Sequence, residues 1–176
     1  MKKVIIYIDG SNFYFSIKRK FKCKINIERF CEKLSKEKDL IEIKYYIAPV
    51  GTSNPDMYIE QQKFFEKIRA IKNLKIIFGR LEKRKRDGKV YFVEKSTDVN
   101  LALDLVLDAQ AELYDEAYLI SNDGDFSGAV KASIERFGKE ITYVAIGNNK
   151  SISHHLKKVA SKTKKIEDEF IKDSKL

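Results

Sequence analysis

The chain has 176 residues, and its 35 Lys and Arg outnumber its 26 Asp and Glu, which gives a formal net charge of +9. This length predicts one domain with a sizeable core and leaves little room for a second domain. The positive charge favours polyanionic partners such as nucleic acid, although lysines that only keep the surface soluble would give the same charge. The apolar runs are too short to cross a bilayer and the two cysteines lack metal-ligand spacing, so we expect a cytoplasmic protein without membrane contact.

Strand-like and helix-like segments alternate along the chain, which is typical of a parallel sheet flanked by helices. Residues 3–8 form a β-branched run, as expected of a strand buried on both faces. Helices are predicted from about residue 13 and over 27–36, a strand over 40–48, and a helix from Pro55 to about residue 71. A strand over 74–81 is followed by Asp87-Gly88, which favours a hairpin turn into residues 90–93 and hence a short antiparallel arm.

The same alternation continues in the second half of the chain. We expect a helix over 97–113, a strand over 116–121, a helix over 126–137 closed by Gly138, a strand over 140–146, and a helix from His154 capped by Ser153. The sequence is mostly charged from residue 163, where only Ile166, Phe170 and Ile171 could dock. We therefore divide the chain into a domain over 1–162 and a charged tail or weak helix over 163–176.

Two acidic turns follow two of the predicted strands. Asp9 ends the first strand, and Asp123 and Asp125 follow the fourth. Ligands of an open α/β sheet bind beyond the carboxyl ends of the strands, where the strand order reverses, so these residues converge if the two strands are neighbours. Carboxylates that close repel one another unless a hard cation neutralises them or they take up protons. A simpler interpretation makes Asp9 an ordinary turn residue and Asp125 a helix N-cap. The adjacent Gly10 and Gly124 are consistent with turns that let a ligand approach the backbone.

Asp98 lies in the first turn of the helix predicted over 97–113. This helix carries a polar stripe, which we expect to face solvent, at Asn100, Asp104, Asp108 and Glu112. Asp98 lies off the stripe, above the apolar side of the helix, where a carboxylate needs a partner. A metal ion would provide that partner, and the alternative is a capping role shared with Ser96 or Thr97.

Basic residues cluster around the predicted hairpin. The cluster consists of Arg80, Lys83, Arg84, Lys85, Arg86 and Lys89. We expect Arg80, Arg84, Lys85 and Arg86 to bind substrate. Tyr91 and Phe92 could stack on unpaired bases, as aromatic residues of single-strand binders do. The same charges could instead protect a sheet edge from pairing with another chain. A second basic cluster, over residues 18–24, is interpreted as solvated surface.

Three segments together resemble the NYN family of PIN-like ribonuclease domains. They are Tyr7-Ile8-Asp9-Gly10-Ser11-Asn12-Phe13, the run from Glu94 to Asp104, and Ser121-Asn122-Asp123-Gly124-Asp125-Phe126. The three segments occur in the family's order, and with the strands around them they cover about residues 3–158. Asn122 departs from the family pattern, in which a small residue, often Gly, is common at this position. The resemblance implies a doubly wound, mainly parallel five-stranded sheet of order 3-2-1-4-5, an acidic cleft that binds magnesium or manganese, and metal-dependent cleavage of RNA.

The family's acidic positions fall on Asp9, Asp98, Asp123 and Asp125, which we assign as metal ligands, directly or through water. With Asn12, which would orient the scissile phosphate or a metal-bound water, they form the expected catalytic set, and Ser121 would support the cleft and its substrate. We therefore expect a metal-dependent endoribonuclease that acts on single-stranded RNA. The alternative is a catalytically inactive PIN-like module that binds RNA or protein. An exposed sheet edge or an apolar helix face could support a homodimer.

Overall fold

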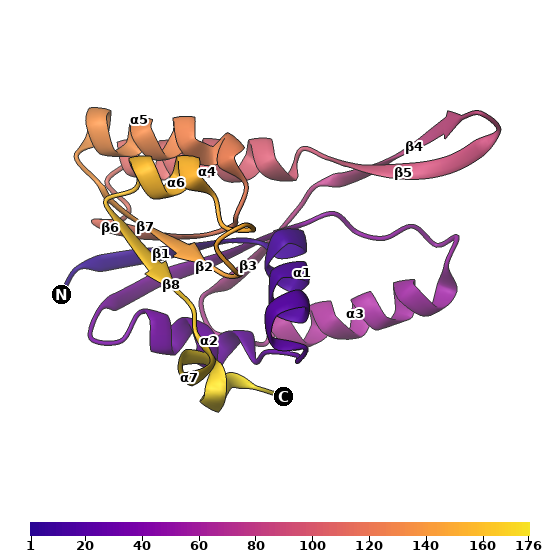
Figure 1. Cartoon of the computed structure of the whole chain (residues 1–176), viewed down its shortest axis with the longest axis horizontal. Coiled ribbons are helices and arrows are strands. Elements are labelled where there is room, and N and C mark those ends of the chain that lie inside the picture. The colour runs from indigo at the N-terminus through magenta and orange to yellow at the C-terminus, as the bar shows by residue number, and fades with distance from the viewer.

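A parallel sheet of six strands runs through the centre of the computed structural model, and helices cover both of its faces (Figure 1). The structure describes the backbone of residues 1–176 and every side chain except that of Glu94. In spatial order the strands are β3 (Leu74–Phe78), β2 (Asp39–Ile47), β1 (Lys3–Asp9), β6 (Glu116–Ile120), β7 (Glu140–Ala145) and β8 (Lys162–Lys165). All neighbouring strands of this sheet are parallel, which confirms the predicted α/β class with a mainly parallel sheet.

The sheet has one strand more than the sequence predicts, so its order differs in detail from 3-2-1-4-5. The additional strand, β8, pairs with β7 and falls where we expected a charged tail or a weak helix to begin. Its sequence Lys-Thr-Lys-Lys lacks the apolar alternation by which a strand is predicted. It is an edge strand, and lysines on an edge strand discourage pairing with another chain. Ile166 and Ile171, which follow it, are fully buried and pack in the core.

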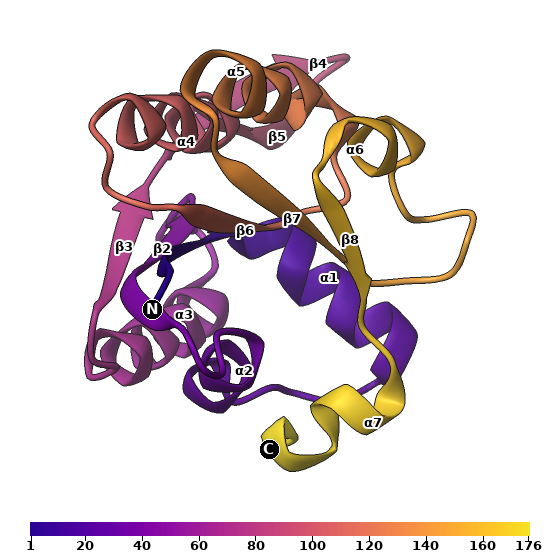
Figure 2. The same ribbon diagram turned by 90° about the vertical axis from the view of Figure 1, so that its left-hand side faces the viewer.

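The helices form two layers, one on each face of the sheet (Figure 2). One layer contains α1 (Gly10–Phe21), α2 (Ile27–Leu34), α3 (Pro55–Arg69) and α7 (Asp168–Ile171), and the other contains α4 (Thr97–Gln110), α5 (Ser127–Phe137) and α6 (His154–Val159). Single 3₁₀ turns cover Gly124–Phe126 and Lys172–Ser174.

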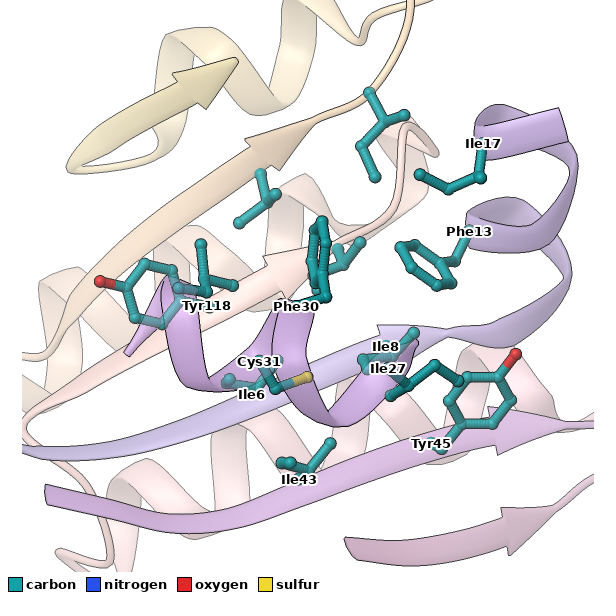
Figure 3. Packing of buried hydrophobic residues seen from close by; sticks show 14 of the residues in the cluster. Ile6, Ile8, Phe13, Ile17, Ile27, Phe30, Cys31, Ile43, Tyr45 and Tyr118 are labelled. Atoms are coloured by element: carbon teal, nitrogen blue, oxygen red, sulfur yellow. The ribbon is translucent and has the colours of Figure 1, made fainter. Parts of the chain in front are cut away.

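Buried apolar residues fill the space between the sheet and each layer of helices. Because side chains alternate along a strand, Ile6 and Ile8 of β1 pack under α1 and α2, whereas Ile5 and Tyr7 pack under α4. Figure 3 shows the first of these cores, where Phe30 of α2 lies over the strands. The core thus holds β1 at the centre of the molecule.

An antiparallel hairpin of β4 (Arg80–Arg86) and β5 (Lys89–Lys95) extends away from the sheet as an arm (Figure 1). Asp87 and Gly88 form its turn with φ values of 51° and 78°, the left-handed conformations that a two-residue hairpin turn requires. The predicted hairpin is therefore confirmed. The preceding strand ends at Phe78 rather than near residue 81, because the chain leaves the sheet at Gly79.

The polar stripe predicted on α4 does not face solvent uniformly. Asp108 is only 8 % exposed, and it accepts hydrogen bonds from the Lys44 ammonium at 2.5 Å and from the Tyr7 hydroxyl at 2.6 Å. Asp104 accepts from the Tyr46 hydroxyl at 2.7 Å. Burial, together with the charge of Asp108, raises the pKa of Tyr7 and keeps its hydroxyl protonated. The expectation was wrong here because β2 carries a buried lysine, and a buried charge requires a partner.

Apolar side chains occupy the exposed side of α4 instead. Val99 is 59 % exposed, and Leu103 and Leu107 are each 53 % exposed, at a spacing of four residues. The expected homodimer stays a prediction, and this stripe is an apolar helix face of the kind that could support it. Within the described residues, none of the helices combines the length and the apolar composition that a membrane-spanning helix needs.

The buried pair of Lys44 and Asp108 generates a prediction about stability. Asp108→Leu removes the hydrogen bonds of the buried Lys44 ammonium and Tyr7 hydroxyl and leaves Lys44 only the longer ion pairs with Glu42 and Asp104, which should lower the free energy of unfolding by about 3 kcal/mol. Adding Lys44→Met and Tyr7→Phe removes both stranded groups and should restore most of the loss, since apolar replacements of buried pairs are often neutral. Denaturant unfolding of the three proteins measures this. A triple variant as unstable as the single variant would show that packing, not charge, dominates here.

Candidate active site

A cleft of about 420 Å³ opens beyond the carboxyl ends of β1 and β6, at the point where the chain connections diverge on either side of β1. It is lined by Asp9, Ser11, Asn12, Phe15, Ser16, Arg19, Thr97, Asp98, Asn122 and Ser151. The first six belong to the end of β1 and to α1, the next two to the start of α4, and Asn122 to the turn after β6. The structure thus brings together three of the five residues expected to be catalytic, namely Asp9, Asn12 and Asp98.

Asp9 connects the two strands that meet at the cleft. Its Oδ1 accepts the backbone N–H of Asn12 at 3.1 Å, which makes Asp9 the N-cap of α1, and its Oδ2 accepts the Ser121 hydroxyl at 2.8 Å. The cap starts α1 at Gly10, three residues before the predicted start. Asp9 therefore both caps α1 and lines the cleft, because the capping hydrogen bond fixes the direction of its carboxylate.

Asp98 reaches the cleft from the opposite layer of helices. It is exposed in the first turn of α4, whose N-cap Ser96 makes no side-chain capping bond. The expected inward position is wrong, because the start of α4 lies at the mouth of the cleft rather than over the apolar core. The N-termini of α1 and α4 both contribute cleft residues, and the positive ends of helix dipoles favour bound anions such as phosphate.

The turn after β6 is built around Asn122. Its backbone N–H donates to Asn12 Oδ1 at 3.0 Å, and its side-chain amide donates to the carbonyl of Ile146 at 2.6 Å. The Tyr143 hydroxyl donates to Asn122 Oδ1 at 2.6 Å and accepts the N–H of Ser153 at 2.9 Å. Burial raises the pKa of Tyr143, so this hydroxyl stays a donor at neutral pH. The asparagine that departs from the family pattern thus ties three segments together.

Asp123 and Asp125 lie on the same turn, but they are not among the described residues that line the cleft. Asp123 Oδ1 accepts the N–H of Asp125 at 2.9 Å, and the Asp123 N–H donates to the Ser121 hydroxyl at 3.1 Å. Asp123, not Asp125, is therefore the cap of the helical segment that follows. Asp125 is exposed. Through Ser121, the turn is linked to Asp9.

The donor atoms in the cleft suit a hard divalent cation. Mg²⁺ prefers oxygen ligands and commonly uses one or two protein carboxylates, with waters and substrate phosphates completing its coordination. Asp9 and Asp98 supply two carboxylates, and Ser11 supplies a neutral oxygen on the same surface. Among the described side chains, no group of three or more His, Cys, Asp or Glu is arranged to hold a metal ion by itself. The residues present therefore fit a cation that keeps part of its coordination for water or substrate.

Gly10 has a different role from the one its sequence context suggests. A Cβ at Gly10 would lie 2.5 Å from a ring carbon of Tyr45 and 2.7 Å from the carbonyl oxygen of Tyr46. Glycine therefore allows the start of α1 to pack against β2, rather than admitting a ligand to the backbone.

Phe15, Ser16 and Ser151 line the cleft although the sequence did not single them out, and Arg19, expected to be solvated surface, and Thr97, considered as a cap, line it as well. Phe15, Ser16 and Arg19 follow Asn12 by three, four and seven residues, so helical periodicity would have indicated all three. Thr97 adjoins Asp98 in sequence, whereas nothing in the sequence connects Ser151 to Asp9. The three-dimensional structure alone shows that contribution.

The predicted basic residues lie on the arm and are divided between its faces by the strand register. Directly paired residues share a face of a hairpin, so Arg80, Arg84 and Arg86 lie on one face with Tyr91. That face also carries Lys89, Lys95 and Glu82. Lys85 lies on the opposite face with Lys83 and Phe92, and Phe92 is turned towards Gly51 of the loop before α3. The structure therefore separates Lys85 from the other three.

Comparison with protein families finds that the model described as NYN domain matches residues 3–167. Among solved structures, a protein of unknown function from Vibrio parahaemolyticus RIMD 2210633 is similar, with a TM-score of 0.75 at 24% identity over 99% of this chain and 96% of that chain. A putative aminotransferase from Clostridium difficile 630 shares 11% identity over 77% of this chain and 34% of its own, but its TM-score of 0.23 carries no argument. No curated protein matches the sequence significantly.

The turn built on Asn122 generates a prediction. Asn122→Ala keeps the backbone bond to Asn12 but leaves the buried Tyr143 hydroxyl without an acceptor, so the free energy of unfolding should fall by about 1–3 kcal/mol. The matched control is Asn149→Ala, an exposed asparagine that should change stability by less than about 0.5 kcal/mol. Denaturant unfolding followed by circular dichroism compares them. Equal stabilities would mean that the side-chain network contributes nothing net.

Proposed function

The chain belongs to the NYN domain family, and from this premise we propose that it is a metal-dependent endoribonuclease that hydrolyses single-stranded RNA in the cleft. The family is nuclease-like, and the match covers nearly the whole chain. The observation that carries the proposal is that Asp9, at the end of β1, and Asp98, at the start of α4, line one cleft together with the N-termini of α1 and α4. A PIN-like fold is part of the same proposal, supported by the order of β3, β2, β1, β6 and β7.

The proposed ligands of magnesium or manganese divide into two groups. Asp9 and Asp98, which line the cleft, would hold the cation, and Asp123 and Asp125, which lie on the turn after β6 outside the cleft lining, would contribute through water. When bound, the cation supplies charge neutralisation at the phosphodiester and activation of the attacking water. Ser121 holds Oδ2 of Asp9, so its hydroxyl fixes the orientation of that carboxylate.

Asn12 and the helix N-termini would position the RNA. The carbonyl oxygen of the Asn12 side chain already accepts hydrogen bonds from Asn122 and Ser16, so its amide nitrogen is the group it can offer to a phosphate. The positive ends of the α1 and α4 dipoles favour the same anion. The formal charge of +9 supports a polyanionic substrate through counterion release.

The alternative is an inactive module that binds RNA or protein without cutting. The carboxylates in the cleft argue against it, because they would repel the phosphates of a bound RNA when no cation is present. Cleavage and binding assays distinguish the two functions directly.

Substitution of Asp98 tests the proposed site. Asp98→Asn should weaken manganese binding measured by calorimetry and lower RNA cleavage by orders of magnitude, because a ligand charge is lost. With the metal chelated, RNA affinity should stay level or rise, since a repulsive carboxylate is gone. The matched control is Asp56→Asn, because Asp56 is also the second residue of a helix, α3, and is exposed outside the cleft.

Two outcomes would contradict the proposal. Equal metal affinity in Asp98→Asn and wild type would remove Asp98 from the metal site. Wild-type protein that binds RNA tightly but cuts no RNA with either metal would favour the binding module.

The arm is proposed to bind the RNA backbone through its basic face. This face carries Arg80, Arg84 and Arg86 beside Tyr91, whereas the other face is turned towards the loop before α3. The arm leads directly into α4 and Asp98, so RNA on this face would continue towards the cleft.

The two faces of the arm allow a matched comparison. Arg84→Gln with Arg86→Gln should reduce the slope of log affinity against log salt by about 1.4, at about 0.7 per lost phosphate contact on a single strand. Lys83→Gln with Lys85→Gln removes the same charge from the other face and should change the slope much less. Fluorescence anisotropy with labelled oligouridylate, without metal, measures both slopes. Equal reductions of the salt slope in the two double variants would mean that the charges of both faces contribute alike. No reduction in either would mean that the charges of the arm only keep the protein soluble.

A further inference from the structure

A second cavity, of about 290 Å³, adjoins the cleft along α1. Ser16, Arg19 and Ser151 line both cavities, so the two form one groove that begins at Asp9 and Asp98 and continues past the middle of α1. From the sequence, the basic residues 18–24 are expected to be solvated surface. Arg19 and Lys20 differ from the rest of that group, because both line the groove.

The wall opposite α1 is a loop whose shape is fixed by its own hydrogen bonds. Gly147 has a φ of 144°, and a Cβ there would lie 2.2 Å from the Ser151 hydroxyl oxygen, so only glycine allows this approach. The Asn148 side chain accepts the N–H groups of Lys150 and Ser151, each at 3.1 Å. A ligand that enters the groove therefore meets a formed wall and loses little free energy in ordering it.

The α1 side of the groove presents groups suited to a nucleic-acid strand. Asn12, Phe15 and Arg19 follow one another at helical spacing, and the Phe15 side chain, although apolar, is 55 % exposed. From Asn12 to Arg19 the helix rises by about 10 Å, at 1.5 Å per residue. Successive nucleotides of a stacked strand rise by about 3.4 Å along the strand axis, so this distance corresponds to about three nucleotides of a stacked strand.

The charges along the groove change sign from one end to the other. The cleft end carries the carboxylates of Asp9 and Asp98, whereas Arg19 lines the part that the two cavities share. Lys20 also lines the second cavity, but its ammonium donates to the carbonyl of Ile166 at 2.7 Å and to Glu167 at 3.0 Å. Arg19 is thus the exposed cation that can hold a phosphate while the carboxylates hold a cation.

We propose that this groove is a subsite for single-stranded RNA beside the position of cleavage, an inference that rests on the proposed function. Phe15 stacks on a base, because an aromatic ring accepts any base on its face. Arg19 binds a backbone phosphate about three nucleotides from the phosphate at Asn12, because its guanidinium matches the oxygens of a phosphate. Both are binding residues, and neither takes part in bond cleavage.

The same helix provides an internal control. Tyr14 and Lys18 precede Phe15 and Arg19 by one residue each, and they form an equivalent aromatic and cationic pair with the Lys18 nitrogen 5.6 Å from the Tyr14 ring centre. Tyr14 is 50 % exposed, close to the exposure of Phe15. Neither Tyr14 nor Lys18 is among the described residues that line the two cavities. The two pairs are therefore similar in residue type and helix position and differ in the surface they face, and the Tyr14 ring also contacts the Phe15 ring edge-on.

The test compares the two pairs by RNA binding with the metal chelated, using labelled oligouridylate of about eight nucleotides, long enough to pass both cavities. Phe15→Ala should weaken binding by about 5- to 140-fold, the range that corresponds to loss of one base stack. Arg19→Gln should weaken binding and reduce the salt slope by about 0.7. Tyr14→Ala and Lys18→Gln should leave both quantities near wild type. Thermal unfolding of each variant verifies that its fold is intact.

A steady-state measurement separates this inference from the proposed function. In a protein that cleaves RNA, Phe15→Ala and Arg19→Gln should raise KM and leave kcat nearly unchanged, because the contacts are the same before and during the reaction. Binding that depends on Phe15 and Arg19 in a protein that cuts nothing would reject the nuclease and keep the subsite. Equal effects in the two pairs, or no effect of Phe15 and Arg19, would overturn the subsite even if cleavage is observed.

Discussion

The hydrogen bond from the Ser121 hydroxyl to Asp9 joins the carboxyl ends of β1 and β6, and the geometry of the cleft depends on it. At this point the chain connections turn to opposite faces of the sheet, so the ends of the two strands would otherwise meet only through their backbones. Asp9 adds a second constraint, because its other oxygen caps α1. One carboxylate thus fixes the direction of a helix and the position of the neighbouring turn, and Asn12 and Asn122 reinforce the same connection.

The second carboxylate of the cleft, Asp98, depends on where α4 lies over the sheet. Lys44 of β2 and Asp108 of α4 form a buried ion pair, and Tyr46 donates to Asp104 one turn nearer the cleft. Buried charges tolerate little displacement, because each needs its partner at hydrogen-bond distance. These contacts therefore help to fix the register of α4 against β2, and the position of the start of the helix with it.

Charge is distributed along the molecule in a way that suits a strand of RNA passing through the cleft. Carboxylates lie at the centre, the basic face of the arm lies on the α4 side, and Arg19 lies on the α1 side. A cation at the centre would complete a continuous positive path, whereas without it the central carboxylates would repel phosphate. The proposed function and the proposed subsite both rest on this arrangement, but different residues carry them.

The sequence by itself determined the alternation of strands and helices, the hairpin at Asp87-Gly88, and the placing of Asp9 and Asp98 at element ends. These features follow from local rules, namely side-chain periodicity, capping and turn preferences. Local rules could not indicate β8, whose pairing depends on backbone hydrogen bonds with β7, nor the burial of Asp108, which depends on a lysine in another strand. Nor could they connect Ser151 with Phe15 and Arg19. Those contacts join segments far apart in the chain, and only the packing of the sheet and its two layers decided which of them meet.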